Sequence, residues 1–149
     1  MLTRRSFLTG LSCSVFVTAA QARTAPLYFS ADGAALTGYD AVSYFQLGRP
    51  QIGREDISLR WKEATWRFAS VENRDRFERN PRAFAPAFGG YCAYAMVTGQ
   101  LSATDPLAWQ IVEGSLYLTS SLEIEKVWRQ NTKVNIIRAE RYWPKVLYG

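Results

Sequence analysis

Two segments alternate apolar and polar side chains on both sides of a tight turn, and this pattern constrains the fold more than any other feature. The first segment covers residues 57–68 and turns at Lys62-Glu63-Ala64. The second covers residues 109–118 and turns at Glu113-Gly114-Ser115. A period of two is typical of strands with one buried face, and a short turn between two such strands indicates an antiparallel hairpin. The sequence therefore predicts two β-hairpins.

Helix signals follow each predicted hairpin. Ser70 is a suitable N-cap for a helix over residues 71–79, which Asn80-Pro81 would end. Two more helices are predicted over residues 121–131 and 133–142. Hairpins and short helices in mixed order predict the α+β class, with one small antiparallel sheet built from the two hairpins and packed by several short helices. The expected inner face and its helical cover consist of Trp61, Trp66, Phe68, Ile111, Leu116 or Tyr117, Phe77, Val127 and Trp128.

The first 22 residues have the pattern of an export leader. Arg4-Arg5-Ser6-Phe7-Leu8 precedes an apolar run that ends in Ala20-Gln21-Ala22. This order is a basic region, an apolar region and a small-residue cleavage site, and the paired arginines match the twin-arginine signal. The apolar run is shorter than the ~20 residues needed to span a bilayer. A lipid anchor at Cys13 is a weaker alternative, because Gly10 stands where an apolar residue is expected.

This pattern predicts a twin-arginine signal peptide over residues 1–22 and a single domain over residues 23–149. The mature protein is expected in the periplasm, with no stable membrane insertion after cleavage. The full chain has 18 basic and 13 acidic residues, and removal of Arg4 and Arg5 leaves 16 basic residues and a net charge of +3. The remaining charges are interspersed without a basic block, so we expect no nucleic-acid partner.

Cys92 is the one cysteine left after removal of the leader, and the chain contains no histidine. An unpaired thiol can be a buried filler, a reactive group, a soft-metal ligand or an intermolecular partner. The lack of histidine excludes Ser-His-Asp and Cys-His catalysis, and the chain has no phosphate-binding loop. Conventional hydrolytic catalysis is therefore not expected.

A metal site would have few ligands to draw on. Met96 follows Cys92 by four residues, so a helix would place thiolate and thioether on one face. That pair suits a soft ion such as Cu(I), whereas zinc normally takes three or four Cys, His or carboxylate ligands. The alternative for the pair is ordinary packing.

Five groups of motifs are spread over nearly all of the chain after the leader. They are Gly38-Tyr39-Asp40-Ala41-Val42-Ser43-Tyr44-Phe45; Ala64-Thr65-Trp66-Arg67-Phe68-Ala69-Ser70 with Glu72-Asn73-Arg74 and Phe77; Asn80-Pro81 with Phe84-Ala85-Pro86; Phe88-Gly89-Gly90-Tyr91-Cys92-Ala93-Tyr94-Ala95; and Asp105-Pro106 with Trp109 and Glu113-Gly114-Ser115-Leu116-Tyr117-Leu118. Together these motifs resemble the exported YHS domain-containing (seleno)protein family.

The resemblance implies a metal-handling module, and it makes Cys92 a candidate site because some relatives carry selenocysteine at the matching position. Relatives often have a histidine where this chain has Leu59, so a Cys/His metal site is not expected here. We expect a binding module rather than an enzyme, with a soft metal ion such as copper or a small ligand held at a site centred on Cys92. Metal ligation would use Cys92 and Met96.

A second hypothesis makes Cys92 the catalytic thiol of a redox or peroxide-reactive protein. Its sulfenic acid would be resolved by a thiol of another protein, such as a periplasmic redox or metal-handling partner. A pure interaction protein is the third possibility. In the binding hypothesis Cys92 lies near a pocket mouth shared with Tyr39, Asp40, Tyr91 and Trp109. A fully enclosed Cys92 that lines no cavity would instead favour the buried filler.

Overall fold

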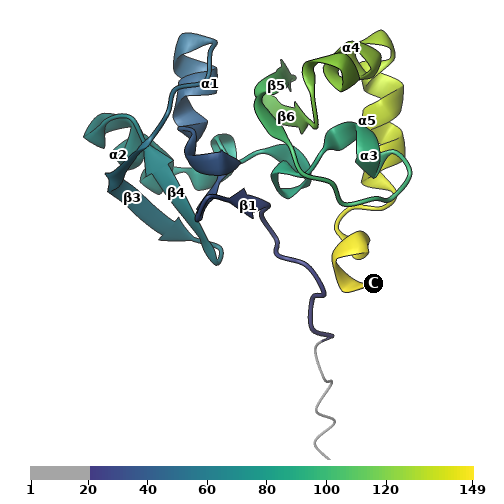
Figure 1. Ribbon diagram of the computed structural model, residues 1–149, viewed down its shortest axis with the longest axis horizontal. Helices are drawn as coiled ribbons and strands as arrows, with labels where there is room; N and C mark the ends of the chain where they lie inside the picture. The colour runs from purple at the N-terminus through teal and green to yellow at the C-terminus, as the bar shows by residue number, and fades with distance from the viewer. Residues whose placement is uncertain (1–20) are drawn as a thin grey trace, which may run out of the picture.

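The computed structural model describes residues 21–149, so the predicted leader lies outside the described residues except for Gln21 and Ala22. Over this range three two-stranded antiparallel sheets alternate with short helices, which confirms the α+β class (Figure 1). The strands and helices are β1 (Ser30–Ala31), β2 (Ala34–Ala35), α1 (Ala41–Leu47), β3 (Arg54–Trp61), β4 (Ala64–Phe68), α2 (Val71–Arg79), α3 (Ala93–Met96), β5 (Asp105–Val112), β6 (Ser115–Thr119), α4 (Leu122–Gln130) and α5 (Thr132–Glu140). Four 3-10 turns complete the order: η1 (Leu36–Gly38), η2 (Pro81–Ala83), η3 (Ala87–Gly90) and η4 (Lys145–Tyr148).

Both predicted hairpins are present, as β3–β4 and β5–β6. Their turns are one residue shorter than expected, with two central residues each, Lys62-Glu63 and Glu113-Gly114. All four residues have positive φ, between 50° and 80°, as the tightest hairpin turns require. The hairpins do not join into one sheet, however, and each forms a separate two-stranded sheet. The expectation of a single sheet was therefore wrong.

Strand β6 of the second hairpin is buried on both faces. Leu116 and Leu118 belong to a first core, which is centred on Trp66, Phe68 and Phe77 from the first hairpin and α2. Tyr117, between them, points into a second core that contains Trp128, Met96 and Leu147. Because successive side chains of a strand point to opposite faces, β6 contributes to both cores.

Each helix accordingly covers its own core. Phe77 of α2 packs on Trp66, with ring centroids 4.8 Å apart, whereas Trp128 of α4 packs on Tyr117 at 5.5 Å. The expectation that these two helices cover the same sheet was wrong, because the two hairpins form separate sheets and Phe77 and Trp128 belong to different cores. Figure 1 shows α1 and α2 beside the first hairpin, and α3, α4 and α5 around the second.

Residues 27–29 form no strand, although their apolar character would suit one, and the first strand begins at Ser30. These residues instead connect the two cores through alternate side chains. Tyr28 contacts Trp66 of the first core, with ring centroids 5.0 Å apart, while Phe29 contacts Tyr91 of the second at 5.6 Å. Residues 28 and 29 are thus part of the packing of both cores.

The longer helices match the sequence signals within two residues at each end. Ser70 caps α2, since its hydroxyl accepts from the Asn73 N–H at 3.2 Å, and Ser121 caps α4 in the same way. Within residues 21–149, none of the helices has both the length and the hydropathy needed to cross a membrane.

Candidate functional site

The site residues expected from the sequence divide between the two cores. Tyr39 and Trp109 pack against the first core, and Trp109 lies edge-on to Tyr44 with ring centroids 5.3 Å apart. Tyr91 and Met96 belong to the second core. The structure keeps Tyr91, Cys92 and Met96 in one short stretch of chain and assigns Tyr39 and Trp109 to the packing of the other core.

Asp40 is a structural carboxylate. Its side chain is fully buried and accepts three hydrogen bonds, from Val42 N at 2.8 Å, Ala69 N at 2.9 Å and Asn73 Nδ2 at 2.7 Å. The first of these bonds caps α1, and the other two hold the end of β4 and helix α2 against it. The carboxylate thus holds α1, the end of β4 and α2 together.

Cys92 is enclosed and caps a helix. Its exposed fraction is 1%, and its Sγ accepts from the Ala95 N–H at 3.5 Å, at the first turn of α3. Its own N–H donates to Ser102 O at 3.0 Å. Cys92 lines none of the three pockets described within residues 21–149. This environment is the one expected of a buried structural cysteine.

The two glycines before Cys92 both have positive φ. Gly89 and Gly90 have φ of 62° and 75°, and the Gly89 carbonyl accepts from Phe29 N at 2.8 Å. Positive φ is a conformation that glycine adopts at little steric cost. The turn brings the chain close to residues 27–29 and delivers Cys92 to the start of α3.

Tyr91 and Met96 flank Cys92 as buried residues. The Tyr91 hydroxyl donates to Pro26 O at 2.9 Å, and burial raises the pKa of this phenol. Met96 is fully buried in the second core. Within the described range no group of three or more His, Cys, Asp or Glu is placed to hold a metal ion, so a metal at Cys92 would depend on the Cys92–Met96 pair.

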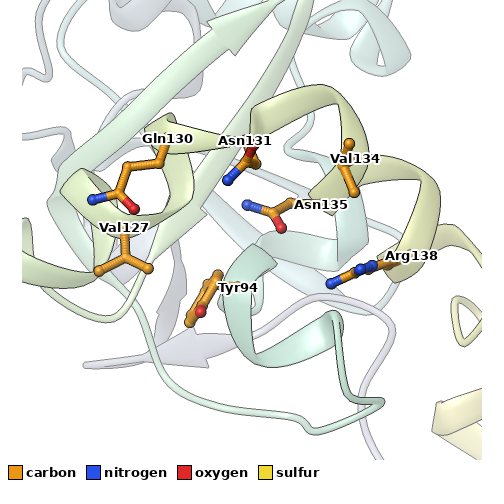
Figure 2. A pocket seen from close by; sticks show the side chains of 7 residues that line it. All are labelled: Tyr94, Val127, Gln130, Asn131, Val134, Asn135 and Arg138. Atoms are coloured by element: carbon orange, nitrogen blue, oxygen red, sulfur yellow. The ribbon is translucent and has the colours of Figure 1, made fainter.

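A pocket that the sequence did not predict lies among α3, α4 and α5 (Figure 2). Its volume is about 340 Å³. It is lined by Tyr94, Val127, Gln130, Asn131, Val134, Asn135 and Arg138. Tyr94 belongs to the helix that Cys92 caps, so the pocket adjoins the predicted region without including the thiol.

The polar side chains of this pocket come mainly from one helix face. Asn131, Asn135 and Arg138 are spaced at i, i+4 and i+7, which puts them on the same side of α5 and its cap. Asn135 is buried, and its Nδ2 donates to Trp128 O at 3.1 Å, which fixes the amide at the pocket wall. The spacing was visible in the sequence, whereas the approach of Tyr94 from α3 depends on tertiary packing.

Family models, curated proteins and solved structures were compared with the chain, and none of them matches. Three amides, a phenol and a guanidinium provide hydrogen-bond donors and acceptors in the pocket, while no carboxylate or thiol lines it. This set is suited to holding a small polar molecule.

Cys92 is expected to resist alkylation in the folded protein, because the thiol must be exposed by local opening before it reacts. Its rate with iodoacetamide, followed by intact mass, should be at least ~10-fold lower than in guanidinium chloride. A matched control is the double variant Cys92→Ala, Ala103→Cys, which places a single thiol at an exposed loop position. Equal rates for the two folded proteins would contradict the buried environment.

Proposed function

We propose that the protein is an exported, non-enzymatic YHS-type module that binds a small ligand beside the Cys92 segment, in the pocket among α3, α4 and α5. The observation that carries the proposal is the position of Tyr94. This residue lines the pocket and belongs to the four-residue helix that Cys92 caps. The pocket's volume, about 340 Å³, is within the range of small-molecule sites.

In this proposal Cys92 positions the site and does not contact the ligand. Helix α3 is too short to be stable by itself. It is held at one end by the Cys92 cap and at the other by the buried Met96. The orientation of Tyr94 therefore depends on the two sulfur-bearing residues that the sequence analysis singled out.

Filling the pocket tests the proposal. Val134 is about half exposed, so Val134→Trp should place an indole in the pocket without disturbing a core. Val71→Trp on α2 is the matched control, at a similarly exposed valine outside this pocket. The proteins are equilibrated with the small-molecule fraction of a cell extract, washed, and analysed by native mass spectrometry.

The wild-type protein and the Val71→Trp variant should retain the same small molecule, and Val134→Trp should lose it. Retention by Val134→Trp would show that binding occurs elsewhere. Failure of the wild-type protein to retain any molecule would contradict a ligand-binding module.

A soft-metal version of the proposal uses Cys92 and Met96 themselves. It is supported by two observations: Cys92 caps α3 and Met96 is the last residue of the same helix, and both residues are buried. Thiolate and thioether are ligands that suit Cu(I). Titration with Cu(I) under reducing conditions tests this version. Affinity that is unchanged by Cys92→Ser would exclude it, because one of only two proposed ligands would be gone.

The thiol-redox alternative is supported by one contact. The Ala95 N–H donates to Cys92 Sγ at 3.5 Å, so the sulfur lies at the start of a helix, where reactive cysteines are often found. Burial of the same sulfur opposes its reaction, because a reagent must first reach it. Alkylation of the folded protein that is rapid well below pH ~8.5 would favour this alternative over a structural thiol.

A further inference from the structure

Arg138 is the one charged residue that lines the pocket among α3, α4 and α5. Within residues 21–149 its guanidinium forms none of the ion pairs, and its side chain is exposed at the pocket rim. Figure 2 shows this side chain reaching from α5 toward α3. A guanidinium presents paired N–H donors that match the two oxygens of a carboxylate.

The opposite end of the pocket has different chemistry. There α4 ends at Gln130, and Asn131 is both the C-cap of α4 and the N-cap of α5. The amides of Gln130, Asn131 and Asn135 line the pocket and can both accept and donate hydrogen bonds. A hydroxyl or amino group of a ligand can donate to an amide oxygen there.

Two apolar side chains complete the lining. Val127 from α4 and Val134 from α5 line the pocket, so it can contact a short aliphatic chain. The lining thus combines one positive group, a small apolar surface and three amides. A ligand with complementary groups has a carboxylate, a few carbon atoms and a hydrogen-bond donor.

We infer that the pocket binds a small aliphatic carboxylate whose other end carries a hydroxyl or amino group, with the carboxylate on Arg138. This inference rests on the proposed function and names the class of ligand. It assigns Arg138 the role of selecting for charge, and it assigns the amides at the junction of α4 and α5 the role of selecting for the donor.

The test uses a hydroxy acid and two analogues, each of which differs from the hydroxy acid by one group. They are 4-hydroxybutyrate, its neutral amide 4-hydroxybutyramide, and butyrate, which lacks the hydroxyl. Each is titrated into the purified protein, and backbone amide chemical shifts are followed by NMR. The hydroxy acid should shift signals of residues 127–138, with the amide and butyrate each at least ~5-fold weaker, because each loses a hydrogen-bonded group.

Two pairs of variants identify the residues responsible. Arg138→Gln should weaken the hydroxy acid at least ~5-fold and remove its advantage over the amide. Arg141→Gln, which removes the same charge outside the pocket, should change neither. Gln130→Glu adds a negative charge among the amides of the pocket and should also weaken binding of the acid, whereas Gln100→Glu, outside the pocket, should not.

Each failure has a separate meaning. If acid and amide bind in the pocket with equal affinity, or if Arg138→Gln behaves like Arg141→Gln, the carboxylate class is wrong and the binding module stands. If none of the probes shifts residues 127–138, the inferred ligand class is also overturned. The proposed function is then decided independently by the Val134→Trp retention experiment.

Discussion

Replacing Gly89 by alanine is expected to destabilise the protein by about 3–5 kcal/mol. A Cβ at this position would lie 2.0 Å from Leu27 O and 2.8 Å from the Trp143 ring. The carbonyl belongs to the backbone of the segment that connects the two cores, so it cannot rotate away. The left-handed backbone, with φ of +62°, adds a cost of ~1–2 kcal/mol for any residue with a Cβ.

The matched control is Gly48→Ala. Gly48 has nearly the same φ, +63°, but its Cβ would meet nothing within 4 Å. Its substitution should therefore cost only the ~1–2 kcal/mol of backbone strain. Urea unfolding followed by tryptophan fluorescence measures both variants, and similar losses for Gly89→Ala and Gly48→Ala would show that the contact with Leu27 is readily relieved.

Replacing Asp40 by alanine is the second change with a large expected effect, a loss of about 3–5 kcal/mol in the free energy of unfolding. The substitution removes one helix cap and leaves the Ala69 N–H and the Asn73 amide without their acceptor in a buried setting. Asp40→Asn, which preserves volume, should still cost about 2 kcal/mol, because an NH₂ group then faces N–H donors.

Ser121→Ala separates the cost of the cap from the cost of the buried network. Ser121 caps α4 through one hydrogen bond to the Ile124 N–H, so its loss should cost about 1 kcal/mol. Chemical denaturation of the three variants under one set of conditions gives the comparison. A loss for Asp40→Ala no larger than that for Ser121→Ala would mean that water replaces the carboxylate in the folded protein.

These two predictions concern motifs that the sequence analysis associated with a possible site. Gly89 lies just before Cys92, and Asp40 was expected at the pocket mouth. In the structure both positions serve the joining of elements: Gly89 allows residues 27–29 to approach, and Asp40 binds α1 to β4 and α2. The pocket lies instead against the other end of the Cys92 segment, at Tyr94.

Local patterns in the sequence alone determined the two hairpins and the helices α2, α4 and α5. Alternation, turn residues and serine caps act over a few neighbouring residues, so their effect can be predicted without knowledge of the rest of the chain. The α+β class followed from the order of these elements.

Tertiary structure decided how these elements combine. The two hairpins form separate sheets, and β6 is shared between two cores, with Leu116 and Leu118 toward one and Tyr117 toward the other. The same division placed Tyr39 and Trp109 in a different core from Tyr91 and Met96. It also brought Tyr94 to Asn135 and Arg138 from a distant part of the chain. Such contacts depend on which apolar faces find each other during packing, and periodicity along the chain specifies that a face is buried without specifying its partner.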